Sequence, residues 1–306
     1  DIASQSSPSI KIDLSSRDFS INSIAFSFED RLLIDPLNGL KDIKHALLRT
    51  NSKNNLLSDP LRILRCFRFV SELNFNIDIE LINFIKKYKN QLSLVANERI
   101  NYELQRIIRG EKALQSIFLI NKFKIFNYIK SDIDFKLINP HKLHFEEFNQ
   151  SEKDEFFPLF CLTQILDEFA LKELKFSKSE ITHTKLLRKW KLRLNKKTID
   201  EFSERERFEL HKELETILPS FIISLPKTMR LDWLKRWRDN DDKLFHPSNL
   251  INGDVIKEYL RIKDGPLLGK LINYLSMELA FKRLDNFDEA IYKGKQWIKQ
   301  NAPKCD

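Results

Sequence analysis

The chain has 306 residues, of which 42% are hydrophobic and 31% charged, a balance typical of a folded protein with a packed core. Its three scattered cysteines form no CxxC pair, which argues against a disulfide framework or a cysteine-based zinc site and favours a reducing, cytoplasmic compartment. The net charge of +8, with no apolar run as long as a membrane span, favours a polyanionic partner, nucleic acid before membrane, or else a generally lysine-rich proteome.

Strands are predicted only near the start of the chain. Residues 20–28 form a half-alternating apolar run, Glu29-Asp30 is a plausible turn, and residues 31–35 return as a partner strand. Residues 36–39 interrupt this hairpin, and residues 41–45 predict a short helical turn.

The rest of the chain predicts helices. Asp59 is a good N-cap and Pro60 suits the first helical position. The predicted fold class is therefore a small α/β piece followed by a long all-α body. The expected helices after the one that starts at Asp59 are 78–88, 97–109, 157–175, 178–194, 200–216, 226–238, 253–262, 266–284 and 287–300, with a linker or loop over 131–155.

Two short segments combine residues that can hold a nucleotide. Arg17, Asp18 and Asn22 lie within six residues at the entry to a strand, where they can hold a phosphate and a ribose hydroxyl or simply form a surface ion pair. The segment Asp35–Ile43 contains a proline and a glycine in positions that suit a tight turn into a helix, and that turn needs no ligand.

A third segment places three arginines on one helix face. Arg62, Arg65 and Arg68 are spaced three residues apart, and Asp59 opens the same face. Guanidinium groups pair bidentately with phosphates, and an aspartate can accept a hydrogen bond from an exocyclic amine of a base. The alternative is a solvated basic face on an amphipathic helix.

Together these segments resemble the class II tRNA nucleotidyltransferase / poly(A) polymerase family. Its blocks are R-R-D-F-x-x-N-A, D-P-F-G-G-x-x-D, E-D-P-x-R-x-x-R-x-x-R-F and E-R-I-x-x-E-L, and the last appears here as Glu98–Leu104. The resemblance covers about residues 10–110. It resumes at Asn249–Asp254 and Lys263–Gly269, which are similar to the tail of CCA-adding enzymes.

The resemblance implies a role for each motif residue. Arg17 would contact the incoming nucleotide, Asp59 and Arg62 would read the Watson–Crick edge of its base, and Arg65 and Arg68 would neutralise its phosphates. In supporting roles, Asp18 and Asn22 would brace the ribose side, Gly39 would lie in a hinge between head and neck, and Arg99 belongs to the E-R-I block.

The chain also departs from the family pattern. Ser16 replaces the first arginine of the doubled pair, and Ser58 replaces the glutamate before Asp59. The G-G-x-x-R-D loop and D-x-D strand, whose two carboxylates hold catalytic magnesium ions, are expected upstream of Asp1, so the catalytic residues are unknown and no metal site is expected in this chain. The segment Asp132-Ile133-Asp134 has the D-x-D pattern, but no Gly-rich loop precedes it. We therefore prefer a role for it in a loop or as a helix cap.

Two further residue patterns bear on RNA binding. A basic stripe of Lys185, Lys189, Arg193, Lys196 and Lys197, and the pair Trp233 and Trp237, could grip RNA or could be a solvated face and a packing pair.

The resemblance implies three parts and a function. The parts are the end of a nucleotidyltransferase head at 1–55, a helical neck at 56–115, and a helical body and tail at 116–306. The intact enzyme would add CMP or AMP from CTP or ATP, with magnesium, to the 3′ end of tRNA or another RNA. A poly(A) polymerase and a non-catalytic RNA-binding protein are the alternatives.

Overall fold

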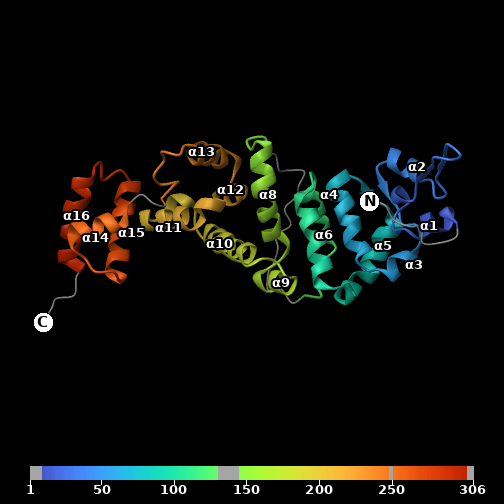
Figure 1. Ribbon diagram of the computed structural model, residues 1–306, viewed down its shortest axis with the longest axis horizontal. Coiled ribbons are helices and arrows are strands. Elements are labelled where there is room, and N and C mark those ends of the chain that lie inside the picture. Colours follow the sequence, from blue (N-terminus) through green and yellow to red (C-terminus); the bar gives the residue numbers. More distant parts are fainter. Residues whose placement is uncertain (1–8, 130–144, 248–250, 302–306) are drawn as a thin grey trace. The chain divides into compact units, whose positions relative to one another are not determined.

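The computed structural model describes residues 9–129, 145–247 and 251–301. The chain divides into two compact units, with the boundary between Lys185 and Leu186. A small β region is followed by a long series of helices, which confirms the predicted fold class (Figure 1). No helix in the described ranges is long and apolar enough to cross a membrane.

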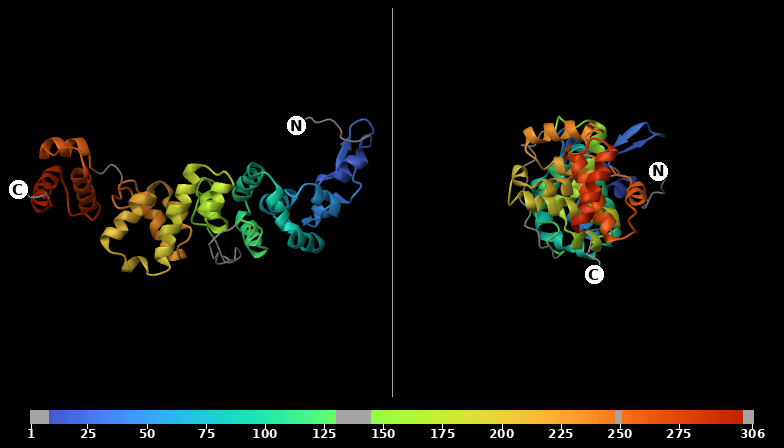
Figure 2. Two further views of the ribbon diagram at one scale, coloured as in Figure 1. Left: turned by 90° about the horizontal axis from the view of Figure 1, so that it is seen from below. Right: turned by 90° about the vertical axis from the view of Figure 1, so that its left-hand side faces the viewer.

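The first unit opens with the predicted hairpin. Strand β1 pairs antiparallel with β2, with Ala25 opposite Ile34, and the hairpin is the pair of blue arrows in Figure 2. It is shorter than expected because residues 20–22 form a 3₁₀ turn instead of extended strand. The elements of this region are α1 (Ile10–Ser16), η1 (Ser20–Asn22), β1 (Ala25–Ser27), β2 (Leu32–Ile34) and α2 (Gly39–Lys44).

The start of α2 explains the turn motif that begins at Asp35. The two carboxylate oxygens of Asp35 accept hydrogen bonds from the backbone N–H groups of Gly39, at 2.7 Å, and Leu40, at 3.0 Å. A Cβ atom on Gly39 would lie 2.2 Å from the carbonyl oxygen of Ser20, so only glycine allows α2 to pack this closely on η1. The hinge role of Gly39 stays a prediction.

A layered set of helices follows the hairpin in the first unit. Strand β3 (Leu47–Leu48) pairs parallel with β4 (Asn76–Ile77) beside them. The helices are α3 (Lys53–Ser58), α4 (Arg62–Leu73), α5 (Ile79–Tyr88), η2 (Lys89–Leu94), α6 (Asn97–Arg109), α7 (Ala113–Lys122), α8 (Gln150–Ile165) and α9 (Glu168–Glu173).

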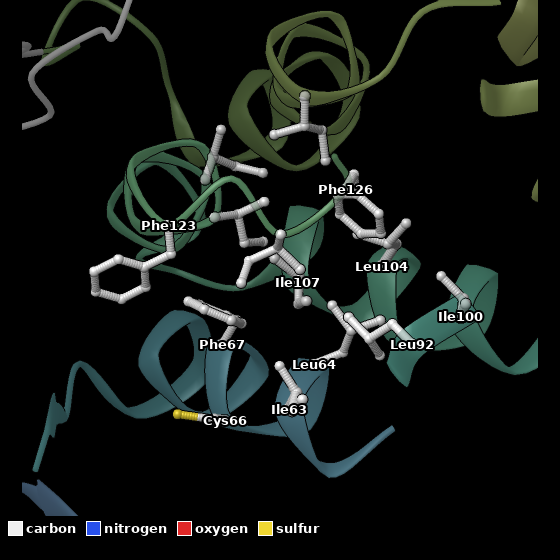
Figure 3. Packing of buried hydrophobic residues seen from close by; sticks show 14 of the residues in the cluster. Ile63, Leu64, Cys66, Phe67, Leu92, Ile100, Leu104, Ile107, Phe123 and Phe126 are labelled. Atoms are coloured by element: carbon white, nitrogen blue, oxygen red, sulfur yellow. The ribbon is translucent and has the colours of Figure 1, made fainter. Parts of the chain in front are cut away.

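The core of the first unit lies where α4 packs on α6 and α7. Figure 3 shows Phe67 of α4 pointing toward Ile107 of α6 and toward Phe123, which follows α7, and all three side chains are buried. At the far end of the α4–α6 contact, a Cβ atom on Gly110 would lie 2.2 Å from the Ser71 hydroxyl oxygen. This close approach fixes the two helices side by side and thereby sets which of their residues can share a cleft.

Helix α10 (Lys178–Leu194) crosses the boundary, and the second unit continues from it. Trp233 is buried against His211 and Phe245, so it is a packing residue and not an RNA contact. A second cluster forms where α14, α15 and α16 pack together. The elements after α10 are η4 (Ile199–Glu201), α11 (Glu204–Leu214), η5 (Glu215–Ile217), α12 (Leu218–Ile222), α13 (Lys227–Arg238), α14 (Gly253–Leu260), α15 (Pro266–Ala280) and α16 (Phe287–Asn301).

The structure corrects two helix boundaries. Residues 150–155, expected in a loop, belong to α8, because the Asn149 side chain and Glu152 form a reciprocal capping box at its start. The expected helix over 157–175 is two helices, because Leu166 is extended and Asp167 caps a new start. Residues 131–144 of the expected loop lie outside the described residues.

Candidate nucleotide-binding site

The predicted nucleotide-binding residues surround one cleft in the first unit. Its volume is about 530 Å³, and it is open to solvent. Four arginines and two aspartates supply the charge of its walls, so the cleft suits an anion that also carries hydrogen-bond donors. The lining residues are Arg17, Asp18, Asn22, Asp59, Arg62, Arg65, Arg68 and Phe69.

Backbone contacts hold Arg17 at the mouth of the cleft. Its carbonyl oxygen accepts hydrogen bonds from the side-chain amides of Asn51, at 2.9 Å, and Asn55, at 2.8 Å. Its guanidinium donates to the Asn22 carbonyl oxygen at 3.1 Å and lies 3.4 Å from the Asp13 carboxylate. The two asparagines are positioning residues that the sequence motifs did not identify, because they lie more than 30 positions away.

Asp18 and Arg65 form a braced pair on the cleft floor. The Asp18 carboxylate is buried and accepts hydrogen bonds from the Phe19 N–H and from the Asn22 amide. Its other oxygen lies 2.7 Å from both Nε and Nη2 of Arg65. Asp18 therefore occupies Nε and Nη2 of Arg65, and Nη1 of this cleft-lining residue forms no ion pair with the described carboxylates.

Asp59 lies between the start of α4 and helix α6. One carboxylate oxygen accepts the Leu61 N–H at 3.2 Å, and the other pairs with Nη2 of Arg99 at 2.8 Å. Helix α4 begins at Arg62 with Leu61 as its N-cap, and not at Pro60 with Asp59 as its cap as expected, because residues 60 and 61 form a turn. Asp59 holds this turn through its hydrogen bond with the Leu61 N–H.

Arg62 is the cleft arginine with the fewest internal partners. Its Nη1 donates to the Ser16 carbonyl oxygen at 3.1 Å, and none of the described carboxylates forms an ion pair with it. Its remaining donors are available to a ligand.

Arg68 is buried and committed to carboxylates. Its Nη1 donates to both oxygens of Glu103, at 3.0 and 3.2 Å, and its Nε lies 3.6 Å from Glu72. Burial lowers the pKa of Arg68, and Glu103 opposes that shift by favouring the charged guanidinium. Burial likewise raises the pKa of Glu103 against the opposing effect of Arg68. This pair braces α4 on α6 and leaves Arg68 less free to meet phosphate than Arg62.

The structure thus brings most of the predicted residues to one place. All five predicted nucleotide contacts line the cleft, together with the supporting residues Asp18 and Asn22. Arg99 and Gly39 do not line the cleft, but Arg99 forms an ion pair with Asp59, which does. Two residues of the site were not predicted from the motifs. Glu103, the second glutamate of the E-R-I-x-x-E-L block, holds Arg68, and Phe69 lines the cleft.

The cleft does not fit a divalent metal by itself. Among residues 9–129, 145–247 and 251–301, no three Asp, Glu, His or Cys side chains come close enough to hold an ion. The expected catalytic carboxylates upstream of Asp1 stay a prediction, and Asp132-Ile133-Asp134 lies outside the described residues.

The basic stripe is partly neutralised within the protein. Lys189 pairs with Glu213 at 2.6 Å, Lys197 pairs with Glu206 at 2.7 Å, and Arg193 lies over the Trp190 ring. Lys185 and Lys196 are exposed and form no ion pair in the described parts of the chain. The RNA-binding role of the stripe stays a prediction.

Two family models match parts of the chain. The poly A polymerase head domain matches residues 2–49, and the probable RNA and SrmB-binding site of polymerase A matches residues 74–137. These matches flank the block from Ser58 to Phe69 that supplies one wall of the cleft.

Similar proteins cover nearly all of the chain. A CC-adding tRNA nucleotidyltransferase of Synechocystis sp. is 25% identical, over 95% of this chain and 76% of its own length. A CCA-adding enzyme of Ligilactobacillus salivarius is 27% identical, over 92% of this chain and 70% of its own length. The structure of the Bacillus stearothermophilus CCA-adding enzyme in complex with CTP shares the fold, with a TM-score of 0.65 at 17% identity over 97% of this chain and 76% of that one.

The two matching family models both describe parts of poly A polymerase, and the cleft is lined by residues of the first match and of the block between the two. The chain belongs to the class II tRNA nucleotidyltransferase family, which includes the CCA-adding enzymes.

Proposed function

We propose that this chain binds a nucleoside triphosphate in the cleft and presents it to an RNA 3′ end, most directly that of tRNA, for addition of CMP or AMP. The observation that carries the proposal is the convergence of Arg17, Asp59 and Arg62 on one cleft. The names of the similar proteins support tRNA as the acceptor and CTP as one donor.

Each cleft residue has a proposed task in binding. The guanidinium of Arg62 donates to ring acceptors of the base, while the Asp59 carboxylate accepts from an exocyclic amine, which cytosine and adenine carry and uracil lacks. Arg17 and the outer nitrogen of Arg65 meet the ribose and phosphates. Arg68, which is paired with Glu103, holds α4 against α6 and so keeps the wall of the cleft in place. Magnesium would be supplied to the reaction by carboxylates outside the described residues.

Triphosphate binding is the first test of this proposal. Binding of CTP, ATP and UTP to the 306-residue chain is measured by competition with a fluorescent triphosphate. CTP or ATP should bind more tightly than UTP, and Arg62→Ala should weaken binding by about tenfold. Arg205→Ala removes an exposed arginine of α11 outside the cleft and is the matched control. Absence of triphosphate binding would contradict the proposal.

The two alternatives give different results in the same assay. A poly(A) polymerase would bind ATP in strong preference to CTP. A non-catalytic RNA-binding protein that kept the nucleotide pocket and the helical body would bind a tRNA transcript, with an affinity that falls steeply as salt is added, and would bind the three triphosphates without a preference for CTP or ATP over UTP.

A further inference from the structure

A second, smaller pocket lies on the outer face of α6. Its volume is about 280 Å³, close to the lower end of the roughly 300–1,000 Å³ typical of small-molecule sites. That size suits one flat group and not a whole triphosphate. We call it the α6 pocket, and its lining residues are Glu72, Tyr102, Gln105, Arg106, Arg109 and Gly110.

Helical spacing places its functional groups on one stripe. Tyr102, Arg106 and Arg109 stand at positions i, i+4 and i+7 of α6 and all three are exposed, while the opposite face of the helix is buried in the core. Tyr102 is 63% exposed, and none of the described residues forms a hydrogen bond or ring contact with it. A largely exposed aromatic ring therefore shares one pocket with two guanidinium groups.

The polar side chains around Tyr102 are braced. Gln105 donates to the Glu180 carboxylate at 2.7 Å, and Arg109 donates to the Gln105 carbonyl oxygen at 3.1 Å. Arg106 pairs with Glu72 at 2.8 Å. Because these groups are held before any ligand arrives, little side-chain freedom is lost on binding.

The lining favours a nucleobase over an apolar peptide. Apart from Tyr102 the pocket has no aliphatic or aromatic side chain that could receive a hydrophobic anchor. Unpaired bases stack on aromatic rings and on arginine planes, and arginines next to the stack meet the adjoining phosphates.

A chain of ion pairs connects the α6 pocket to the nucleotide cleft. Arg68 lines the cleft and lies 3.6 Å from Glu72, which in turn pairs with Arg106 of the α6 pocket. The two sites therefore share a wall built from α4 and α6. The α6 pocket therefore lies beside the cleft in which the RNA 3′ end would meet the nucleotide.

We propose that the α6 pocket binds an unpaired nucleobase near the 3′ end of an RNA, stacked on Tyr102 and flanked by Arg106 and Arg109. This inference rests on the proposed function, since it supplies the acceptor subsite beside the nucleotide cleft. It identifies Tyr102 as a binding residue for single-stranded RNA.

The test uses two matched RNA probes and the full 306-residue chain. One probe is a fluorescent hairpin with a short unpaired 3′ overhang, and the other is the same hairpin with a blunt end. Tyr102→Ala should weaken binding of the overhang hairpin by at least about fivefold and leave the blunt hairpin within about twofold. Tyr102→Phe keeps the stacking face and should bind like the unmodified chain. Tyr292→Ala is the control, because Tyr292 is 64% exposed on α16, outside both sites.

The outcomes separate the subsite from the proposed function. If Tyr102→Ala binds the overhang hairpin as tightly as the unmodified chain, or weakens both hairpins equally, the subsite is wrong, whatever the triphosphate assay shows. If the unmodified chain does not bind the overhang hairpin at all, the subsite is also wrong. If the Tyr102 effect appears while CTP and ATP fail to bind, the subsite stands and the proposed nucleotide function is wrong.

Discussion

Replacement of Asp59 by alanine tests whether this carboxylate selects the base. Asp59 accepts the Leu61 N–H and pairs with Arg99, and its side chain is still partly open to the cleft. In the proposed complex it also accepts from the exocyclic amine of cytosine or adenine. Loss of a good base contact costs roughly 1–3 kcal/mol, so Asp59→Ala should relax selection against UTP by about tenfold.

The same substitution has a structural cost that must be separated from selectivity. Loss of the hydrogen bond from the Leu61 N–H costs about 1 kcal/mol of unfolding free energy. Loss of the ion pair with half-exposed Arg99 costs about 0–1 kcal/mol more. Asp78→Ala is the matched control, because Asp78 caps α5 by accepting the Glu80 N–H at 2.9 Å and does not line the cleft.

Competition binding of CTP, ATP and UTP to both variants, after denaturation curves confirm that they are folded, decides the question. We expect Asp78→Ala to lose stability and keep the nucleotide preference of the unmodified chain. If Asp59→Ala does the same, Asp59 only supports the turn before α4 and its assignment to base reading is refuted.

Three further predictions follow from the described contacts. Arg65→Ala should weaken the binding of CTP, ATP and UTP alike, and a loss of binding for only one of them would contradict this. The unfolding free energy should fall by less than the roughly 3–5 kcal/mol lost when a fully buried ion pair is broken, since Arg65 is one-third exposed. The 306-residue chain, incubated with magnesium, labelled CTP or ATP and a tRNA that lacks its 3′ end, should not extend the RNA, because no three Asp, Glu, His or Cys side chains of the described residues come together to hold the metal ion; addition above background would refute this prediction. Burial lowers the pKa of His211 to about 3, with Arg236 adding to the effect and Asp242 opposing it. The unfolded chain takes up that proton near pH 6.5, so the stabilisation is complete above pH 6.5 and is lost toward pH 3, by up to about 1.4 kcal/mol per pH unit. Denaturation midpoints at pH 7 and pH 5 should therefore differ less in His211→Phe than in the unmodified chain, and an equal difference would contradict the prediction.

Local sequence was sufficient to predict most of the expected helices and most of the residues that line the cleft. Helices α6 and α10 occupy the predicted ranges 97–109 and 178–194, because apolar periodicity and end signals act within a few residues. The hairpin followed from alternation and a turn in the same way. Arg17, Asp59 and Arg62 were identified by their motifs, and each lines the cleft.

Tertiary structure alone decided what each arginine is free to do. Arg62, Arg65 and Arg68 have identical spacing, so periodicity cannot distinguish them. Arg65 is tied to Asp18, 47 positions away, and Arg68 to Glu103, 35 positions away, while Arg62 meets only a backbone carbonyl. These partners come together only when α4 packs against α6 and against the segment before β1. Burial then makes an unpaired charge costly, so Arg65 and Arg68 are held by carboxylates, whereas Arg62 forms no ion pair with the described carboxylates.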